Sequence, residues 1–575
     1  MRVNFKCLMC ALTFAVFTKL SYSQSYSETK DKFVPCDVMP QLLHHFNADY
    51  AALQRFYVVR QSPARRARLE NLYSDYINQL DGVDFKSLSQ ECKVDYLLFG
   101  RDLREKLRLS KEEANELHQV AFLFPFADKI YEAEKQRTRG TYLDSKKLAI
   151  DLHHTTLEIG ALSTSLRDSA IILDATSIVR AEETINGLKT ALNSVMEFYN
   201  GYDPLFTWWV PVPAGQVDSA LTAYATVIKS KGKTLGKYNI IARTPVGKEE
   251  LSKLLEHALI PYTIDELIAI ATKEFEWCET EFRKVSRDMG FGDDWKKAVE
   301  FVKDTYVDPG HQPEAIYDLY KQSVDFVNAH DLVTAPPLEE EVWGMKMRPS
   351  ERGSGRFFQG GRDITITYPT NNWYINYRLE SMRGNNPNFS FATVHHELIP
   401  GHNATSYNDQ RYRSYRNFGS SFSGEGWALY WEFLLWDMGF PKTNEQKIGM
   451  LFWRIHRAAR IIFSSNFQMG NWTPDQCVDF LVNKVGHEFG NAIYEVGGHV
   501  RPNNYPLYQL SYLVGGLQFY SLKKELVDSG KMPIKEFHDN ILHLSSMPVE
   551  MVRNIFLDNK LIENYQSNWK FYNFR

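Results

Sequence analysis

Residues 263–275 read TIDELIAIATKEF, and this stretch indicates the fold class of the first half of the chain. Its apolar residues recur at spacings of three and four: Ile264, Leu267, Ile268, Ala271 and Phe275. That spacing is the period of one face of an α-helix. Thr263 is a suitable N-cap, because its hydroxyl can accept a hydrogen bond from an amide of the first turn. Similar patterns run from about residue 37 to residue 338, so we expect this half to be helical.

A different pattern begins after the prolines at residues 336 and 337. Residues 350–361 are rich in glycine and arginine, which predicts a loop. Apolar and polar residues then alternate over residues 364–368 and again over residues 373–377. This alternation predicts two short strands, joined as a hairpin. Helical spacing resumes at Phe391 and continues, with interruptions, to the C-terminus.

We therefore predict a mainly α, two-lobed, metallopeptidase-like fold with a short β-hairpin or small sheet beside the helix that carries the active site. The predicted domains are a signal peptide at residues 1–23, an N-terminal helical lobe at residues 24–345 and a C-terminal lobe at residues 346–575 that carries the metal site.

The first 23 residues have the pattern of a cleavable secretory signal. Positive residues, an apolar run of eleven residues and a small-x-small site ending at Ser23 follow one another. The run is shorter than the roughly 20 residues of a transmembrane helix, and no later uncharged segment reaches that length. Cys10 lies in the run, but Met9 before it lacks the small side chain that lipoprotein processing needs. We expect a mature, secreted or periplasmic chain that starts at Gln24, without a lipid anchor or an integral membrane segment.

Charge and cysteine content exclude some classes of protein. The 66 basic and 70 acidic residues give a net charge of −4, and removal of the signal makes the chain more acidic. This balance lacks the clustered positive charge of nucleic-acid-binding proteins. The mature chain keeps four cysteines, none in a Cys-x-x-Cys pair. Cys36 and Cys92 could form a disulfide, but four cysteines allow three pairings and the sequence does not choose among them.

Residues 393–402 read TVHHELIPGH and carry the residue types of a zinc site. Imidazole and carboxylate groups are ligands that zinc prefers, and zinc peptidases place a glutamate beside the first histidine as general base. His396 and His402 are six residues apart, so a continuous helix would turn them about 120° away from each other. Pro400 lacks an amide hydrogen and Gly401 adopts unusual backbone angles. We expect the helix to break there, so that His402 swings back.

Two glutamates follow at Glu425 and Glu432, seven residues apart and therefore on one helical face. Glu425 lies 23 residues after His402, which leaves enough chain for a helix, a loop and an antiparallel return. Two histidines and one glutamate leave a coordination position open, as a hydrolytic zinc needs. Glu425 could instead pair with Arg454 or Arg457. Glu432 either supports a ligand or lies on a solvated helix face, and a glycosidase that uses both glutamates ranks lower.

The segment resembles the bacterial family called domain of unknown function 885, whose pattern His-Glu-x-x-Pro-Gly-His precedes Glu-Gly-Trp-Ala. That pattern is similar to a variant of the gluzincin metallopeptidases, and this chain has both parts in the same order. The resemblance extends over most of the mature chain. It implies a Zn²⁺ cofactor held by His396, His402 and Glu425, with Glu397 as the general base.

The resemblance also implies roles for residues nearer the C-terminus. In gluzincin-like enzymes a tyrosine or histidine of this region stabilises the oxyanion, and Tyr512 is our candidate because a phenol can donate a hydrogen bond without titrating. Arg501 could hold a substrate carboxylate in a bidentate contact. The chain departs from the pattern of its relatives at Asn403, Thr405, Gln468 and Tyr508. These departures imply a different substrate pocket and different surroundings for the ligands.

His487 and Glu488 repeat the His-Glu dipeptide without a second histidine nearby, and we interpret them as surface residues. Taken together, the sequence predicts a secreted or periplasmic zinc peptidase that hydrolyses peptide bonds with Glu397 as base. The alternative is a catalytically inactive homologue that keeps the metal and binds a peptide or another ligand. The expected partner is a peptide, no nucleic-acid partner is expected, and the oligomeric state is not indicated.

Overall fold

The structure is a computed structural model that describes residues 33, 35–232, 236–349, 358–416 and 418–573. The predicted signal peptide at residues 1–23 lies outside these residues. Among the helices of the described segments, none is both long enough and apolar enough to cross a membrane.

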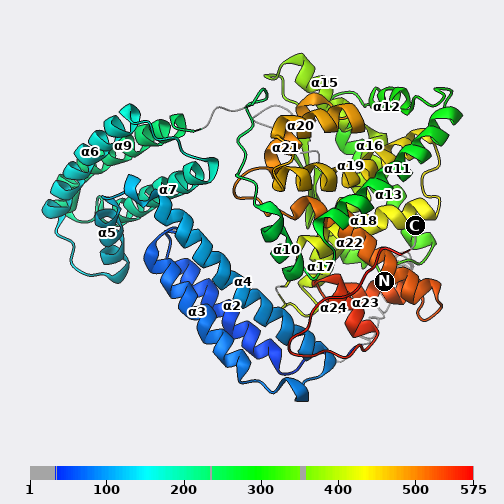
Figure 1. The fold of residues 1–575 in the computed structure, drawn as a ribbon, viewed down its shortest axis with the longest axis horizontal. Coiled ribbons are helices and arrows are strands. Elements are labelled where there is room, and N and C mark those ends of the chain that lie inside the picture. Colours follow the sequence, from blue (N-terminus) through cyan, green and yellow to red (C-terminus); the bar gives the residue numbers. More distant parts are fainter. Residues whose placement is uncertain (1–32, 34, 233–235, 350–357, 417, 574–575) are drawn as a thin grey trace, which may run out of the picture. The chain divides into compact units, whose positions relative to one another are not determined.

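The chain is mainly helical, as predicted (Figure 1). The helices that precede the sheet are α2 Met39–Phe56, α3 Pro63–Asp81, α4 Gln90–Val120, α5 Ala127–Arg139, α6 Ser145–Asp168, α7 Ala175–Tyr199, α8 Pro204–Trp209, α9 Pro211–Ser230, α10 Gly247–His257, α11 Ile264–Asp288, α12 Trp295–Lys303, α13 Gln312–Ala329 and α14 Pro337–Val342. The strands are β1 Gly344–Pro349, β2 Phe358–Gln359 and β3 Asp363–Tyr368. The helices that follow the sheet are α15 Ile375–Gly384, α16 Pro387–Glu397, α17 His402–Asp409, α18 Ser421–Asp437, α19 Asn444–Gln468, α20 Pro474–Phe480, α21 Phe489–His499, α22 Tyr508–Lys523, α23 Ile534–His543 and α24 Val549–Phe556. Short helical turns are η1 Phe85–Ser87, η2 Ala121–Leu123, η3 Leu481–Val485 and η4 Lys524–Asp528.

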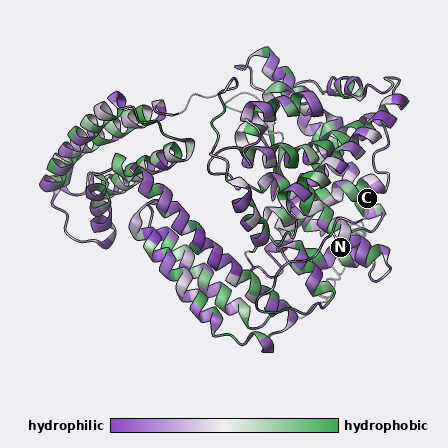
Figure 2. Ribbon diagram, in the orientation of Figure 1, coloured by the Kyte–Doolittle hydropathy of each residue, from purple (hydrophilic) through white to green (hydrophobic). Residues whose placement is uncertain are grey.

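Helix α11 begins where the sequence predicts. The Thr263 hydroxyl accepts a hydrogen bond from the Glu266 amide, and the Glu266 carboxylate accepts one from the Thr263 amide. This reciprocal pair satisfies two amides that a helix start leaves free. Leu267 and Ala271 are fully buried, and α11 packs against α19. Figure 2 shows hydrophobic and hydrophilic residues alternating along the helices, as amphipathic helices require.

The sheet has the strand order β1-β3-β2, with β1 parallel and β2 antiparallel to the central β3. Ile364 and Ile366 of β3 are fully buried, which confirms the predicted strand at residues 364–368. The predicted second strand at residues 373–377 is wrong, because α15 begins at Ile375. Side chains in that stretch are largely exposed, Tyr374 at 81% for example, so the alternation there does not mark a buried face.

Helices on either side of residue 345, the predicted lobe boundary, pack against each other. Helix α11 contacts α19, and α13 contacts α16. A separate hydrophobic core joins α5, α6, α7 and α9. The division into lobes at residues 24–345 and 346–575 stays a prediction.

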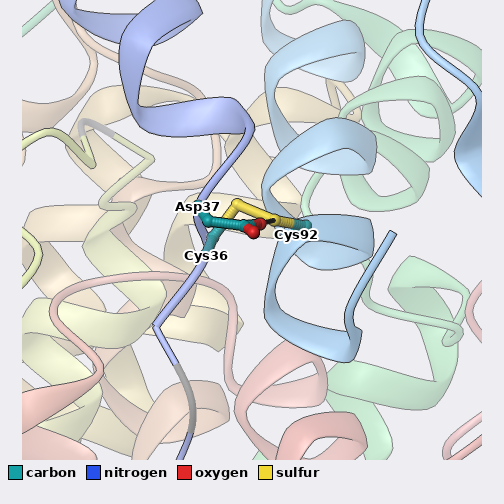
Figure 3. Close-up of side chains that lie close together, drawn as sticks. All are labelled: Cys36, Asp37 and Cys92. Carbon is teal, nitrogen blue, oxygen red and sulfur yellow. Dashed lines mark hydrogen bonds between the residues drawn. A yellow bond between two sulfur atoms is a disulfide. The ribbon is translucent and has the colours of Figure 1, made fainter. Parts of the chain in front are cut away.

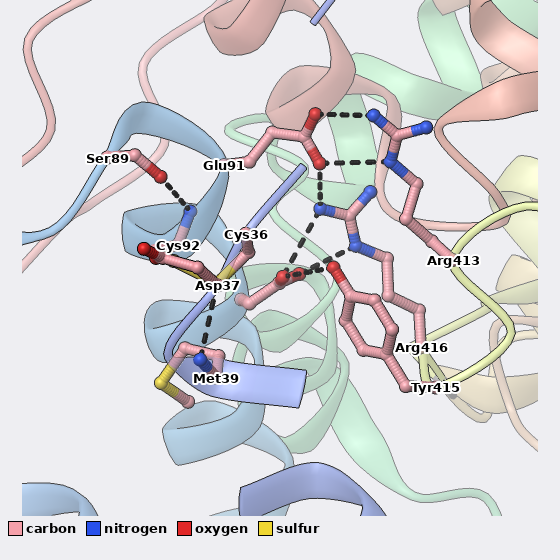
Figure 4. The surroundings of a disulfide bond; sticks show 10 residues. Cys36, Asp37, Met39, Ser89, Glu91, Cys92, Arg413, Tyr415 and Arg416 are labelled. Atoms are coloured by element: carbon pink, nitrogen blue, oxygen red, sulfur yellow. Dashed lines mark hydrogen bonds and ion pairs between the residues drawn. A yellow bond between two sulfur atoms is a disulfide. The ribbon is translucent and has the colours of Figure 1, made fainter. Parts of the chain in front are cut away.

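A disulfide joins Cys36 to Cys92, and the other two described cysteines, Cys278 and Cys477, are buried thiols. The structure thus contains the Cys36–Cys92 bond, which the sequence left as one possibility. The bond attaches the segment before α2 to the first turn of α4 (Figure 4).

Buried ion pairs beside the disulfide hold the segment that follows α17. Glu91 of α4 accepts hydrogen bonds from Arg413 and Arg416, as Figure 4 shows. Asp95 of the same helix accepts bonds from Arg416 and Tyr415. All four charged side chains are buried, so each needs its partners to offset the loss of hydration. The network therefore fixes the link between α17 and α18, the two helices that carry His402 and Glu425.

Helices α18 and α22 cross with their backbones in contact. A Cβ at Gly426 would lie 2.5 Å from the Gly515 Cα, and a Cβ at Gly515 would lie 2.0 Å from the Phe422 carbonyl oxygen. Ordinary contacts begin at 3.4 Å, so only glycine fits at either position. This close crossing brings Glu425 of α18 beside Tyr508 of α22.

Candidate metal centre

The helix that carries the first histidine ends where the sequence predicts. Helix α16 ends at Glu397, and α17 begins at His402. A Cβ at Gly401 would lie 2.0 Å from the His396 carbonyl oxygen, so the linking segment folds tightly back on the end of α16. The Trp427 indole donates a hydrogen bond of 2.9 Å to the Pro400 carbonyl, which anchors the link to α18. The break is thus confirmed.

His396, His402 and Glu425 converge. The Nε2 atoms of His396 and His402 lie 3.3 and 3.2 Å from the same carboxylate oxygen of Glu425, Oε2. The three candidate ligand atoms all lie within 4.8 Å of one another. Four ligands at about 2.0–2.1 Å from a zinc ion in a tetrahedron are roughly 3.3–3.4 Å apart. The donor types and the two distances to Glu425 Oε2 therefore fit Zn²⁺.

Glu432 supports His396, the first of the two candidate histidine ligands. Its Oε1 lies 2.8 Å from His396 Nδ1, and both side chains are buried. A proton on Nδ1 leaves the Nε2 lone pair free to face the cluster, an arrangement typical of metal-bound histidines. The alternative partners for Glu425 are engaged elsewhere. Arg457 pairs with Glu432, and Arg454 pairs with Glu274 of α11. Glu432 thus supports a candidate ligand and does not lie on a solvated face.

Two tyrosines of α22 lie beside the candidate ligands. The Tyr508 hydroxyl donates a 2.7 Å hydrogen bond to Glu425 Oε1 and lies 3.1 Å from the Tyr512 hydroxyl. The Tyr512 ring stacks on His396, with ring centroids 6.1 Å apart. Sequence reasoning missed Tyr508, which it treated only as a departure from the family pattern. The four-residue spacing of the tyrosines, which puts them on one helical face, was the available signal.

The charges of the cluster shift the pKa values of its members. Burial opposes a charge on His396, but hydrogen bonds with Glu425 and Glu432 outweigh burial and raise its pKa to about 9. Burial also opposes ionisation of Glu425, yet the two imidazoles hold the pKa of that carboxyl well below its usual range. The surroundings therefore stabilise a positive charge at the point where the three side chains meet, as a divalent cation requires.

Burial, followed by the nearby Glu425 carboxylate, raises the pKa of the Tyr512 hydroxyl above its ordinary value. Burial and interactions with Tyr512 and Glu425 do the same for the pKa of Tyr508. Both phenols therefore stay protonated at neutral pH and act as hydrogen-bond donors.

The structure places the other predicted residues as follows. Glu397 is the last residue of α16, and its carboxylate lies against Gly360, where a Cβ would be 2.3 Å from Glu397 Oε2. No hydrogen bond or ion pair joins that carboxylate to another residue of the described segments. Arg501 is exposed in the turn between α21 and α22, and no contact links its side chain to the three-residue cluster. His395 is fully buried with its ring against Phe440.

His487 is buried, so its interpretation as a surface residue is wrong. Its Nε2 lies 2.9 Å from His456 Nδ1 on α19. Nearby, Glu495 of α21 accepts a 2.6 Å hydrogen bond from Arg460, whose guanidinium lies over the Tyr512 ring. A second cluster of polar side chains therefore packs against the Tyr512 ring. It is assembled from helices that are distant in sequence, which is why local patterns did not reveal it.

A second set of possible ligands, Cys36, Asp37 and Cys92, does not form a metal site (Figure 3). The two sulfur atoms are bonded to each other, and a metal-binding cysteine must be a thiolate. Within the described segments, the cluster of His396, His402 and Glu425 is the remaining set of convergent ligands.

These features define a mainly helical protein with a partly buried centre of two histidines and one glutamate. The chain belongs to the family described as "Bacterial protein of unknown function (DUF885)", which matches residues 57–555. The resemblance to this family is thereby confirmed.

The solved structures that are similar to the chain include the following two. One is described as "a putative lipoprotein of unknown function from Shewanella oneidensis", with 15% identity, a TM-score of 0.61, and coverage of 91% of this chain and 100% of that chain. The other is "the putative lipoprotein from Colwellia psychrerythraea", with 16% identity, a TM-score of 0.53, and coverage of 91% and 99%. At these identities the likeness shows the fold alone. No curated protein matches the chain.

Proposed function

We propose that this protein is a zinc-dependent peptidase that acts outside the cytoplasm. The observation that carries the proposal is the convergence of His396 Nε2 and His402 Nε2 on one oxygen of Glu425. Two histidines and one carboxylate are the protein ligands of a class of catalytic zinc sites that keep one position open. The hydrogen bond from His396 to Glu432 supplies the outer support that such sites have.

Each residue of the centre has its own role in the proposed peptide hydrolysis. Zinc, when bound, supplies a Lewis acid that polarises a carbonyl group and lowers the pKa of water. The Glu397 carboxylate takes a proton from the attacking water and passes it to the leaving amine. The Tyr512 hydroxyl donates a hydrogen bond to the developing oxyanion. Tyr508 holds Glu425 Oε1, so that Oε2 stays turned toward the two imidazoles.

The extracytoplasmic location has three supports. A disulfide such as Cys36–Cys92 is typical of proteins in an oxidising compartment. The first 23 residues have the pattern of a secretory signal. The two similar structures named above are each described as a "putative lipoprotein". Intact-mass analysis of the exported chain distinguishes a start at Gln24 from acylation at Cys10.

Metal analysis and peptide hydrolysis test the proposal together. We expect about one zinc per purified chain and cleavage of a panel of internally quenched peptides. The Glu397→Gln variant should keep its zinc but lose activity by at least about 100-fold, because a general base contributes that much. Glu314→Gln, which alters an exposed glutamate of α13, is the matched control and should behave as wild type.

Two results contradict the proposal. If the purified protein binds no zinc even after zinc is supplied, the proposed metal centre is contradicted. Protein with zinc but without hydrolysis in either form supports the alternative, a metal-containing homologue that binds its ligand without turnover.

A further inference from the structure

An open cavity of about 410 Å³ lies beside the small sheet, within the size range of ligand pockets. Lys346 of β1, Thr365 of β3 and Gln359 of β2 are neighbours in the strand register, and all three line the cavity. Ile364 and Ile366 alternate with the lining residues of β3 and are fully buried. The alternation along β3 therefore gives the sheet one apolar face for the core and one polar face for the cavity.

The cavity is basic although the whole chain carries a net charge of −4. Its cationic side chains are Lys346, Arg348 and Arg362, and its single carboxylate, Asp363, pairs with Lys346 and, at 4.0 Å, with Arg362. Arg348 forms no ion pair with any residue in the described segments. Gln359 and Gln410 also line the cavity and add neutral donors. This set of groups favours an anionic ligand over a neutral or cationic one.

The cavity adjoins the candidate active site. Gly360 lines it, and a Cβ at Gly360 would lie 2.3 Å from Glu397 Oε2, so the proposed general base borders the cavity wall. Asn403, the residue after His402, donates hydrogen bonds of 3.0 and 3.1 Å to the carbonyls of Gly361 and Arg362. The wall that carries Arg362 is thus attached to the first turn of α17.

We propose that this cavity binds a carboxylate of the peptide substrate, either the C-terminal carboxylate or that of an acidic side chain. The inference rests on the proposed peptidase function and specifies its substrate class. Arg348 and Arg362 offer planar guanidinium groups, which bind carboxylates through paired hydrogen bonds. Gly360 packs against Glu397, so a carboxylate held there would be separated from the proposed general base by one backbone segment. This assignment differs from the prediction for Arg501, which no contact links to the cluster.

Isothermal titration calorimetry with zinc-loaded Glu397→Gln protein tests the proposal, because this variant should bind peptides without cleaving them. Three acetylated pentapeptides serve as probes: pentaalanine with a free C-terminus, pentaalanine amide, and the amide with glutamate at the central position. We expect at least one of the two anionic probes to bind about tenfold more tightly than the neutral amide. The probe with the higher affinity identifies the source of the carboxylate.

Substitutions in the cavity, compared with a control substitution outside it, test whether the peptide carboxylate binds there. Arg348→Gln and Arg362→Gln should each weaken binding of the preferred anionic probe about fivefold, as loss of an exposed charged contact does. Arg362→Glu should weaken it further. Binding of the neutral amide should not change. Lys297→Gln, which removes an exposed cation of α12, should leave all three affinities as they are.

Equal affinity for all three probes, or anion binding that is unaffected by the arginine variants, overturns the proposal. Zinc-dependent cleavage of neutral peptides without a preference for carboxylates leaves the peptidase function in place and removes only this inference. If the protein binds peptides through a carboxylate but the wild type does not hydrolyse them, the proposed binding site is supported and only the peptidase function is contradicted. Absence of both binding and hydrolysis contradicts both.

Discussion

Replacing Gly426 by alanine tests how the crossing of α18 and α22 holds the cluster together. The new Cβ would lie 2.5 Å from Gly515 Cα, about 0.9 Å closer than ordinary contact allows. Both contacting groups are helix backbone, so no rotamer change relieves the overlap and the helices must separate. Overpacking costs about 1–3 kcal/mol, and the better helix propensity of alanine returns up to about 1 kcal/mol. We expect a loss of about 2 kcal/mol in the free energy of unfolding.

The same separation has a second effect. Moving the helices apart by about 0.9 Å would stretch the 2.7 Å bond between Tyr508 and Glu425 to about 3.6 Å, which is outside hydrogen-bonding range. Loss of such a support typically weakens metal binding about 10- to 100-fold. A competition assay against a chromophoric chelator measures this change, and urea denaturation measures the change in stability.

Gly424→Ala is the matched control, because Gly424 lies on the other side of Glu425 and a Cβ there meets nothing within 4 Å. We expect it to be neutral, or more stable by up to about 1 kcal/mol, with unchanged zinc affinity. If the two alanine variants have the same denaturation midpoint and the same zinc affinity, the reasoning from the helix crossing is refuted.

Three further predictions concern other parts of the molecule. Glu432→Gln should lower zinc affinity about 10- to 100-fold in the competition assay, because His396 loses its charged partner; unchanged affinity would show that this contact does not support a ligand. Reducing the Cys36–Cys92 bond, which closes a loop with a sequence separation of 56, should cost up to about 4 kcal/mol, and a denaturation midpoint that does not change with reductant would contradict this. Burial, with repulsion from Glu340, raises the pKa of Glu339 to about 8, so the folded chain holds that proton more tightly than the unfolded chain and stability should fall as pH rises from about 4.5 to 8. Glu339→Gln should make denaturation midpoints at pH 5 and pH 8.5 more alike, and an equal fall in both proteins would refute this cause.

Local patterns predicted the features that short segments determine. The capping residue Thr263 and the apolar face after it predicted α11, because helix formation depends on contacts within a few residues. Pro400 and Gly401 predicted the end of α16, because each acts on its own backbone. Two histidines and a later glutamate of the right chemistry predicted the candidate ligands.

The same patterns failed where the burial of side chains determines the local structure. Residues 373–377 alternate in polarity as a strand does, yet their side chains lie largely in solvent and the chain there turns into α15. His487 repeats the His-Glu dipeptide without a second histidine nearby, but tertiary packing buries it against His456. A period in sequence therefore indicates a structure only where one of its faces packs against another element.

By itself, the sequence determined the helical class, the break between His396 and His402, and the residue types that can hold a zinc ion. Only the tertiary structure decided that Glu432 supports His396, that Tyr508 holds Glu425 across 83 residues of chain, and that a basic cavity adjoins Glu397. The physical reason is that these contacts depend on how closely helices approach, as at Gly426 and Gly515. Such distances are set by packing between segments far apart in the chain and leave no periodic signal within either one.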